Sequence, residues 1–154
     1  MSESVRPLFL AAGWFQGRRA WFTRFAGLKE LASFPLGTAL IREFGGLRVG
    51  RSGPGLERVA SDVVFFRQPS AAHRYAVAEM ESPGDDLFPL GEAHDGHMEI
   101  FIDTRGRLWV DSIPDGELLI AGNTFADGIE RLLLGHMWPD KQSSEPHARA
   151  DDRA

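Results

Sequence analysis

Two short apolar runs separated by a glycine-containing turn constrain the fold of this chain more than any other feature. Residues 98–102 (MEIFI) and 107–111 (RLWVD) are rich in β-branched and aromatic residues, which favour strands. Residues 103–106 (DTRG) lie between them, and Gly106 can adopt the positive backbone φ angle that such a turn requires. The pattern predicts a β-hairpin, and therefore an antiparallel sheet.

Further strands are predicted on both sides of this hairpin. The run at residues 62–66 (DVVFF) favours a strand, and Leu47 leads into another after a double glycine. Residues 118–121 (LLIA) follow a turn at residues 115–116 and are predicted to form a third strand beside the hairpin.

Two helices are predicted before the first strand, and another is predicted to begin at residues 69–70, after the strand at residues 62–66. One face of a helix over residues 17–31 is formed by apolar residues at spacings of four, three and four, namely Trp21, Phe25, Leu28 and Ala32. Leu36, Leu40 and Phe44 recur every four residues and predict a second helix. A double glycine follows, and we expect Gly45 to end this helix in the left-handed conformation.

A last helix is predicted after the sheet. Its apolar stripe consists of Phe125, Ile129, Leu132 and Leu133. Asn123 or Thr124 is the expected N-cap, and Gly135 is expected to end the helix. The chain of 154 residues fits one α+β domain, which we place at residues 1–138, with a disordered polar tail at residues 139–154.

The composition excludes several classes of protein. There is no cysteine, which rules out disulfides, thiolate nucleophiles and cysteine-ligated metal sites. No apolar run approaches the roughly 20 residues needed to cross a bilayer. Arg18 and Arg19 follow the first apolar patch where a signal peptide would carry small residues. We expect a soluble, cytoplasmic protein without membrane contact.

Charge is unevenly distributed along the chain. Residues 1–78 hold 11 Lys and Arg against 5 Asp and Glu, whereas residues 79–117 hold 2 against 11. Such separation can create surface fields that steer a charged partner. We therefore expect a protein partner to bind the acidic segment, through Glu79, Glu81, Asp85, Asp86, Glu92, Asp95 and Glu99.

Trp109 completes this predicted surface. It stands between Leu108 and Val110, which we expect to face the core, so alternation along the strand points Trp109 to the opposite face. Tryptophan is enriched among the residues that contribute most to binding energy at interfaces.

Catalytic and cofactor sites are not predicted. The metal-like constellation of Glu92, His94, Asp95, His97 and Glu99 lacks the helical spacing of zinc peptidases, and Gly96 indicates a solvated turn. Paired carboxylates such as Asp85 and Asp86 have no partner that would position them. A metal- or carboxylate-dependent hydrolase is the less favoured alternative, and we expect no cofactor.

Direct binding of nucleic acid is not predicted either. The arginines of the basic first half are spread along the chain, and no nucleic-acid recognition motif accompanies them. The glycines at residues 45–50 follow a helix and precede a strand, which is the reverse of the order in a phosphate-binding loop.

Several segments, taken in order, resemble the SUKH superfamily of bacterial immunity proteins, specifically its third family. The resemblance covers about residues 12–135 and consists of segments 12–18, 40–47, 88–91, 102–109, 123–125 and 132–135. It implies an α+β fold with a curved, mainly antiparallel sheet flanked by helices.

The resemblance also implies a function. Members of this family resemble inhibitors that bind and neutralise the toxin domains of polymorphic toxin systems, often a nuclease or a nucleic-acid deaminase. An immunity protein with a cognate toxin as partner and no catalytic residues is therefore expected. A general protein-interaction or regulatory domain is the alternative, because related domains occur in proteins that resemble fungal cell-wall synthesis regulators.

Overall fold

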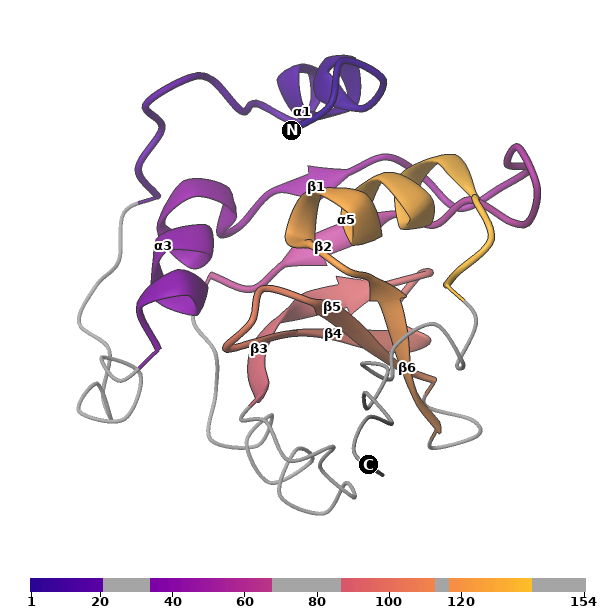
Figure 1. Ribbon diagram of the computed structural model, residues 1–154. Coiled ribbons are helices and arrows are strands. Elements are labelled where there is room, and N and C mark those ends of the chain that lie inside the picture. Colours follow the sequence, from indigo (N-terminus) through magenta and orange to yellow (C-terminus); the bar gives the residue numbers. More distant parts are fainter. Residues whose placement is uncertain (21–33, 68–86, 113–116, 140–154) are drawn as a thin grey trace, which may run out of the picture.

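The computed structural model describes residues 1–20, 34–67, 87–112 and 117–139, and these form a six-stranded open sheet with helices packed on it (Figure 1). The strands are β1 (Arg48–Val49), β2 (Val63–Phe65), β3 (Leu87–Ala93), β4 (Met98–Asp103), β5 (Leu108–Ser112) and β6 (Glu117–Gly122). Each strand pairs antiparallel with the next in sequence. The predicted α+β fold with a curved antiparallel sheet is confirmed.

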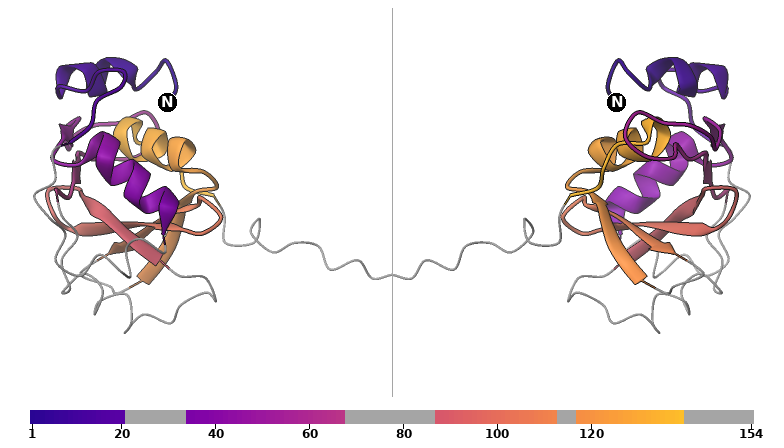
Figure 2. Two further views of the ribbon diagram at one scale, coloured as in Figure 1. Left: turned by 90° about the vertical axis from the view of Figure 1, so that its left-hand side faces the viewer. Right: turned by 90° about the vertical axis from the view of Figure 1, so that its right-hand side faces the viewer.

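The helices of the described chain are α1 (Arg6–Ala11), α3 (Pro35–Phe44) and α5 (Phe125–Leu134), and they pack on one face of the sheet (Figure 2). Phe9, Ile41 and Ile129, one from each helix, share a single apolar cluster with Val63 and Ile102 of the sheet. The opposite face carries a separate, smaller cluster that contains no residue of the described helices.

The predicted hairpin is β4–β5, and its loop sets the register. The backbone N–H of Asp103 donates to the carbonyl of Arg107 at 3.1 Å, and that of Gly106 donates to the carbonyl of Asp103 at 3.1 Å. Gly106 has a φ of +85°, as expected for a three-residue loop that ends in a left-handed glycine. As a result Glu99 lies directly opposite Asp111.

Helix α3 is confirmed, with two corrections of detail. Its buried residues are Gly37, Leu40, Ile41 and Phe44. Leu36 is 40% exposed, because it lies one position outside this face. The left-handed glycine is Gly46, with a φ of +80°, and not Gly45, which is extended with a φ of −50° and a ψ of 131°. Gly45 is needed for space, since a Cβ there would lie 2.5 Å from the carbonyl oxygen of Ile41.

Helix α5 begins and ends as the sequence predicts. Thr124 is the N-cap, and its hydroxyl accepts a hydrogen bond from the backbone N–H of Asp127 at 3.1 Å. Gly135 ends the helix in the left-handed conformation, with a φ of 69°.

Two described elements were not predicted. Helix α1 has only six residues and so shows no apolar period. Strand β3 contains Pro89 and Gly91, which weaken its strand signal, and the register shifts between them. Of the helix predicted over residues 17–31, residues 17–20 are not helical. The residues of its apolar face, Trp21, Phe25, Leu28 and Ala32, lie outside the described residues.

The junction of β6 and α5 depends on two glycines in close contact. A Cβ at Gly122 would lie 2.2 Å from the backbone nitrogen and 2.4 Å from the Cα of Gly128. We expect Gly122→Ala to lower the free energy of unfolding by about 1–3 kcal/mol, because backbone atoms of a packed helix cannot move aside cheaply. Urea unfolding measures this loss. Gly53→Ala is the matched control, since nothing lies within 4 Å of that Cβ, and equal stability of the two variants would contradict the prediction.

Candidate partner-binding surfaces

Three carboxylates form a row across the sheet on the face away from the described helices. Glu92 on β3 is the direct partner of Glu99 on β4, and Glu99 is the direct partner of Asp111 on β5. Directly opposite residues of antiparallel strands project from one face, and like charges in such pairs repel one another. We call Glu92, Glu99 and Asp111 the carboxylate row.

Asp111 is the member of the row that sequence reasoning missed. Its Oδ1 atom is buried and has no hydrogen-bond partner among the described residues. Burial raises the pKa of Asp111 above its ordinary value. The signal that could have found it is the three-residue loop of the hairpin, which places Asp111 opposite Glu99. A cationic group beside Asp111 would relieve the desolvation of its carboxylate.

Trp109 projects from the same face as the row, as the alternation predicts, but it is only 7% exposed. It packs with Leu87 and Phe101, and its indole Nε1–H donates to Oδ2 of Asp103 at 2.9 Å. Trp109 therefore stabilises the hairpin from within, and in this structure its ring is not an exposed anchor.

Asp95 lies at the turn between β3 and β4 and is held by a buried carboxylate. The side chain of Asp62 is buried, and it accepts hydrogen bonds from the backbone N–H of Asp95 at 2.7 Å and from the guanidinium of Arg48 at 2.8 Å. Burial alone would raise the pKa of Asp62, but these donors and the Ser52 hydroxyl hold it below its ordinary value. The exposed carboxylate of Asp95 also pairs with Arg48 at 3.3 Å, which partly offsets its charge.

The two histidines of this turn are engaged with neighbouring groups. His94 Nδ1 lies 3.3 Å from the Ser61 hydroxyl, and His97 Nδ1 lies 2.8 Å from the carbonyl oxygen of His94. Within the described ranges, no three His, Asp or Glu side chains converge as metal ligands. The turn predicted from Gly96 is confirmed, with a φ of +81° at that residue.

The predicted surface is thus described only in part. The structure brings Glu92 and Glu99 together and places Asp95 at the adjacent turn. The remaining acidic residues of the prediction lie outside the described residues: Glu79, Glu81, Asp85 and Asp86.

Two segments that carry the family resemblance meet in space at the end of α3. The guanidinium of Arg18 donates to the carbonyl oxygens of Glu43 and Gly45, which are left without helical partners where α3 ends. The indole Nε1–H of Trp14 donates to the Glu43 carboxylate at 3.0 Å. Residues 12–18 therefore hold residues 40–47 in place through hydrogen bonds from Arg18 and Trp14. These contacts explain in structural terms why the two segments occur in the same chain.

The sequence model of the SUKH-3 immunity protein family matches residues 1–135 of the 154. The chain belongs to this family. No curated protein and no solved structure matches it. In the part of this SUKH-3 protein that the structure describes, no helix is long and apolar enough to span a membrane.

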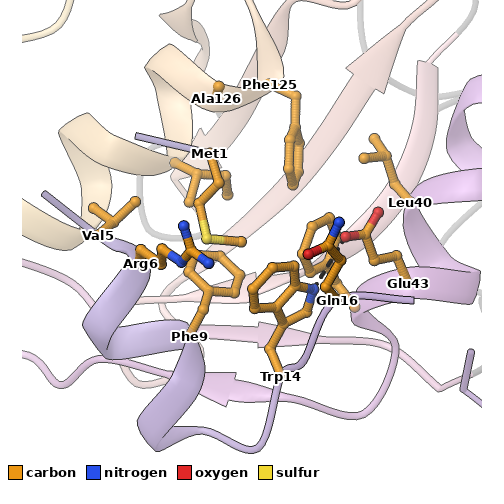
Figure 3. Close-up of a pocket in the computed structure, with 12 residues that line it drawn as sticks. Met1, Val5, Arg6, Phe9, Trp14, Gln16, Leu40, Glu43, Phe125 and Ala126 are labelled. Atoms are coloured by element: carbon orange, nitrogen blue, oxygen red, sulfur yellow. Dashed lines mark hydrogen bonds between the residues drawn. The ribbon is translucent and has the colours of Figure 1, made fainter. Parts of the chain in front are cut away.

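Residues from segments 12–18 and 40–47 of this SUKH-3 protein also line a pocket between α1, α3 and α5 (Figure 3). Its cavity volume is about 490 Å³. The lining is mainly apolar and aromatic, and it includes Phe9, Trp14, Leu40, Phe44, Phe125 and Ile129. Arg6, Gln16 and Glu43 are the polar side chains around it. Sequence reasoning missed this pocket, because its walls come from three separate helices and from residues outside them, such as Trp14 and Gln16.

Proposed function

We propose that this chain neutralises a cognate toxin by binding it, and that the carboxylate row and Asp95 contact a basic surface of the toxin. Membership of an immunity protein family supports a toxin as the partner. The observation that carries the choice of surface is the register that aligns three carboxylates across β3, β4 and β5. Glu79, Glu81, Asp85 and Asp86 extend the same proposed surface.

A toxin that acts on nucleic acid suits such a surface. A nuclease or nucleic-acid deaminase must present a basic cleft to the phosphate backbone. An acidic face accelerates the encounter with such a cleft and can block it once bound. Neutralisation then requires contact only, and no catalytic residue of this chain takes part in the proposal.

Co-expression tests the function itself. The chain is produced together with the product of the adjacent reading frame, under conditions in which that product alone stops growth. Rescue of growth supports immunity. Failure against every neighbouring frame contradicts the proposal and favours a general interaction or regulatory domain.

A charge change in the row tests the proposed surface. We expect Glu92→Lys to slow association with the toxin by several-fold up to about tenfold at low salt and to flatten the salt dependence, because steering depends on the net field of the surface. Stopped-flow or surface-plasmon association rates measure this. Glu92→Gln should give a smaller effect in the same direction.

The control for this surface is Glu130→Lys, which makes the same charge change as Glu92→Lys on α5, on the helical face of the sheet. Its association rate should match that of the native protein. If Glu92→Lys and Glu130→Lys behave alike, the row is not the contact surface, although immunity would stand.

A further inference from the structure

The pocket between α1, α3 and α5 has an aromatic floor and walls. The ring centroids of Phe9 and Phe44 are 5.3 Å apart, and those of Phe44 and Phe125 are 5.4 Å apart. The indole of Trp14 forms a wall beside them (Figure 3). The volume of about 490 Å³ lies within the range of roughly 300–1,000 Å³ that is usual for binding pockets. Faces of aromatic rings attract cations as well as apolar groups.

Two polar groups beside this wall have unused hydrogen-bonding capacity. Glu43 accepts from the Trp14 indole through Oε1 only, and its Oε2 atom has no partner among the described residues. The side-chain amide of Gln16 likewise makes no hydrogen bond to the described residues, and Figure 3 shows it beside Glu43. A carboxylate fixed at one oxygen by an indole presents the other oxygen in a defined direction.

The cationic group of the pocket lies apart from these acceptors. Arg6 stands on the side away from Glu43 in Figure 3, and its guanidinium contacts Glu3 at 3.5 Å. Arg18, the other nearby cation, is occupied by the carbonyl oxygens at the end of α3. Arg6 lies beside Phe9 in Figure 3, whereas at the other end of the pocket Glu43 forms no ion pair with a cation of the described residues.

We infer that this pocket accepts an arginine or lysine side chain of a protein partner. The aliphatic stem lies over Phe125, since Phe9 and Phe44 are buried beneath it, and the cationic head stacks on Trp14 and donates to Glu43 and Gln16. The inference rests on the proposed function only in taking that partner to be the toxin. The pocket and the carboxylate row lie on opposite sides of the sheet, so they form two separate contacts.

A titration with small probes tests the chemistry of the pocket without the toxin. The full chain, labelled with ¹⁵N, is titrated with N-acetyl-arginine methylamide while the indole N–H resonance of Trp14 is followed. We expect a saturable shift. N-acetyl-citrulline methylamide, which is neutral and nearly isosteric, should bind about tenfold more weakly, because hydrogen bonds to ionised groups are about twice as strong as neutral ones.

Glu43→Gln is the informative variant, since its amide oxygen can still accept from Trp14 and the fold should be kept. We expect this variant to lose the preference for arginine over citrulline. Glu92→Gln makes the same change on the other side of the sheet, and this variant should keep the preference for arginine over citrulline. Three results would each overturn the inference. The native protein could bind the two probes equally, it could bind N-acetyl-glutamate methylamide more tightly than either, or the Trp14 resonance could fail to shift with any probe.

Binding of the toxin separates this inference from the proposed function. Glu43→Gln should raise the dissociation rate about tenfold, whereas Glu92→Lys should act mainly on association. If Glu43→Gln binds the toxin as tightly as the native protein does, the pocket is not a toxin contact, while the proposed function stands. If no neighbouring product binds the native chain, the proposed function fails, and the probe titration alone decides the pocket.

Discussion

Asp103→Ala is expected to lower the free energy of unfolding by about 3–5 kcal/mol, because it leaves buried donors without their acceptor. The Asp103 side chain is fully buried. Its Oδ1 atom accepts from the backbone N–H groups of Arg105 and Arg107, at 2.9 and 2.8 Å. Its Oδ2 atom accepts from Arg107 Nε at 2.6 Å and from Trp109 Nε1 at 2.9 Å. The Asp103 carboxylate therefore closes the β4–β5 loop and connects it to Trp109, on the face of the sheet opposite the described helices.

Asp103→Asn is the matched variant, because it keeps the shape and one acceptor oxygen but loses the charge. We expect a smaller loss than for Asp103→Ala, since hydrogen bonds to a charged group contribute about 1.5–3 kcal/mol each and only part of that is removed. Urea unfolding of both variants measures the difference. A loss below about 1 kcal/mol for Asp103→Ala would contradict the buried network.

The acid dependence of stability provides a second measurement of the same group. Burial alone would raise the pKa of Asp103, but hydrogen bonds from Trp109 and Arg107 outweigh it and hold the pKa below its ordinary value. A group with a lowered folded-state pKa stabilises the fold above its unfolded pKa, about 3.9 for aspartate, and this contribution is lost as the pH falls through the folded value. Stability should therefore drop below about pH 4, less steeply in Asp103→Asn.

The hairpin shows how far the sequence alone can lead. Alternating apolar residues and Gly106 predict two paired strands, and both are present. The register depends on one further fact, which is that residues 104–106 form the loop while Asp103 pairs with Arg107. A shift by one residue would move every side chain to the opposite face. For this reason the carboxylate row could be seen only once the register was known.

Helix α3 illustrates a second limit. A spacing of four residues selects Leu36, Leu40 and Phe44, but the buried face also includes Gly37 and Ile41, so its centre lies away from Leu36. Gly37 would not be chosen on hydrophobicity. It is required because a Cβ there would lie 2.4 Å from the ring of Phe88. Close approach between elements far apart in sequence leaves no periodic signal.

The pocket was beyond sequence reasoning for the same reason. Its polar residues, Arg6, Gln16 and Glu43, come from α1, from the segment after α1 and from α3, and they share no motif in the sequence. Residues 12–18 and 40–47 both carry the family resemblance, and the Arg18 contacts show that these two segments are joined in the fold. The packing of Phe9 on Phe44 determines which of these side chains border the pocket.

Phe44→Ala is expected to lower the free energy of unfolding by about 3–5 kcal/mol, which is the usual cost of removing a buried phenylalanine ring. Phe44 is 5% exposed, and its ring centroid lies 5.3 Å from that of Phe9, 5.4 Å from that of Phe65 and 5.4 Å from that of Phe125. It therefore joins all three described helices to the sheet. Small domains are stable by only about 5–15 kcal/mol, so this single loss is a large fraction of the total.

Phe15→Ala is the control for Phe44→Ala, because Phe15 is 60% exposed and its removal should change stability by no more than about 0.5 kcal/mol. Urea unfolding with an unchanged slope measures both variants. If Phe44→Ala were as stable as Phe15→Ala, α1 and α5 would not depend on the aromatic cluster. The pocket would then lack the rigid floor that an inserted side chain requires, because the same ring forms part of both.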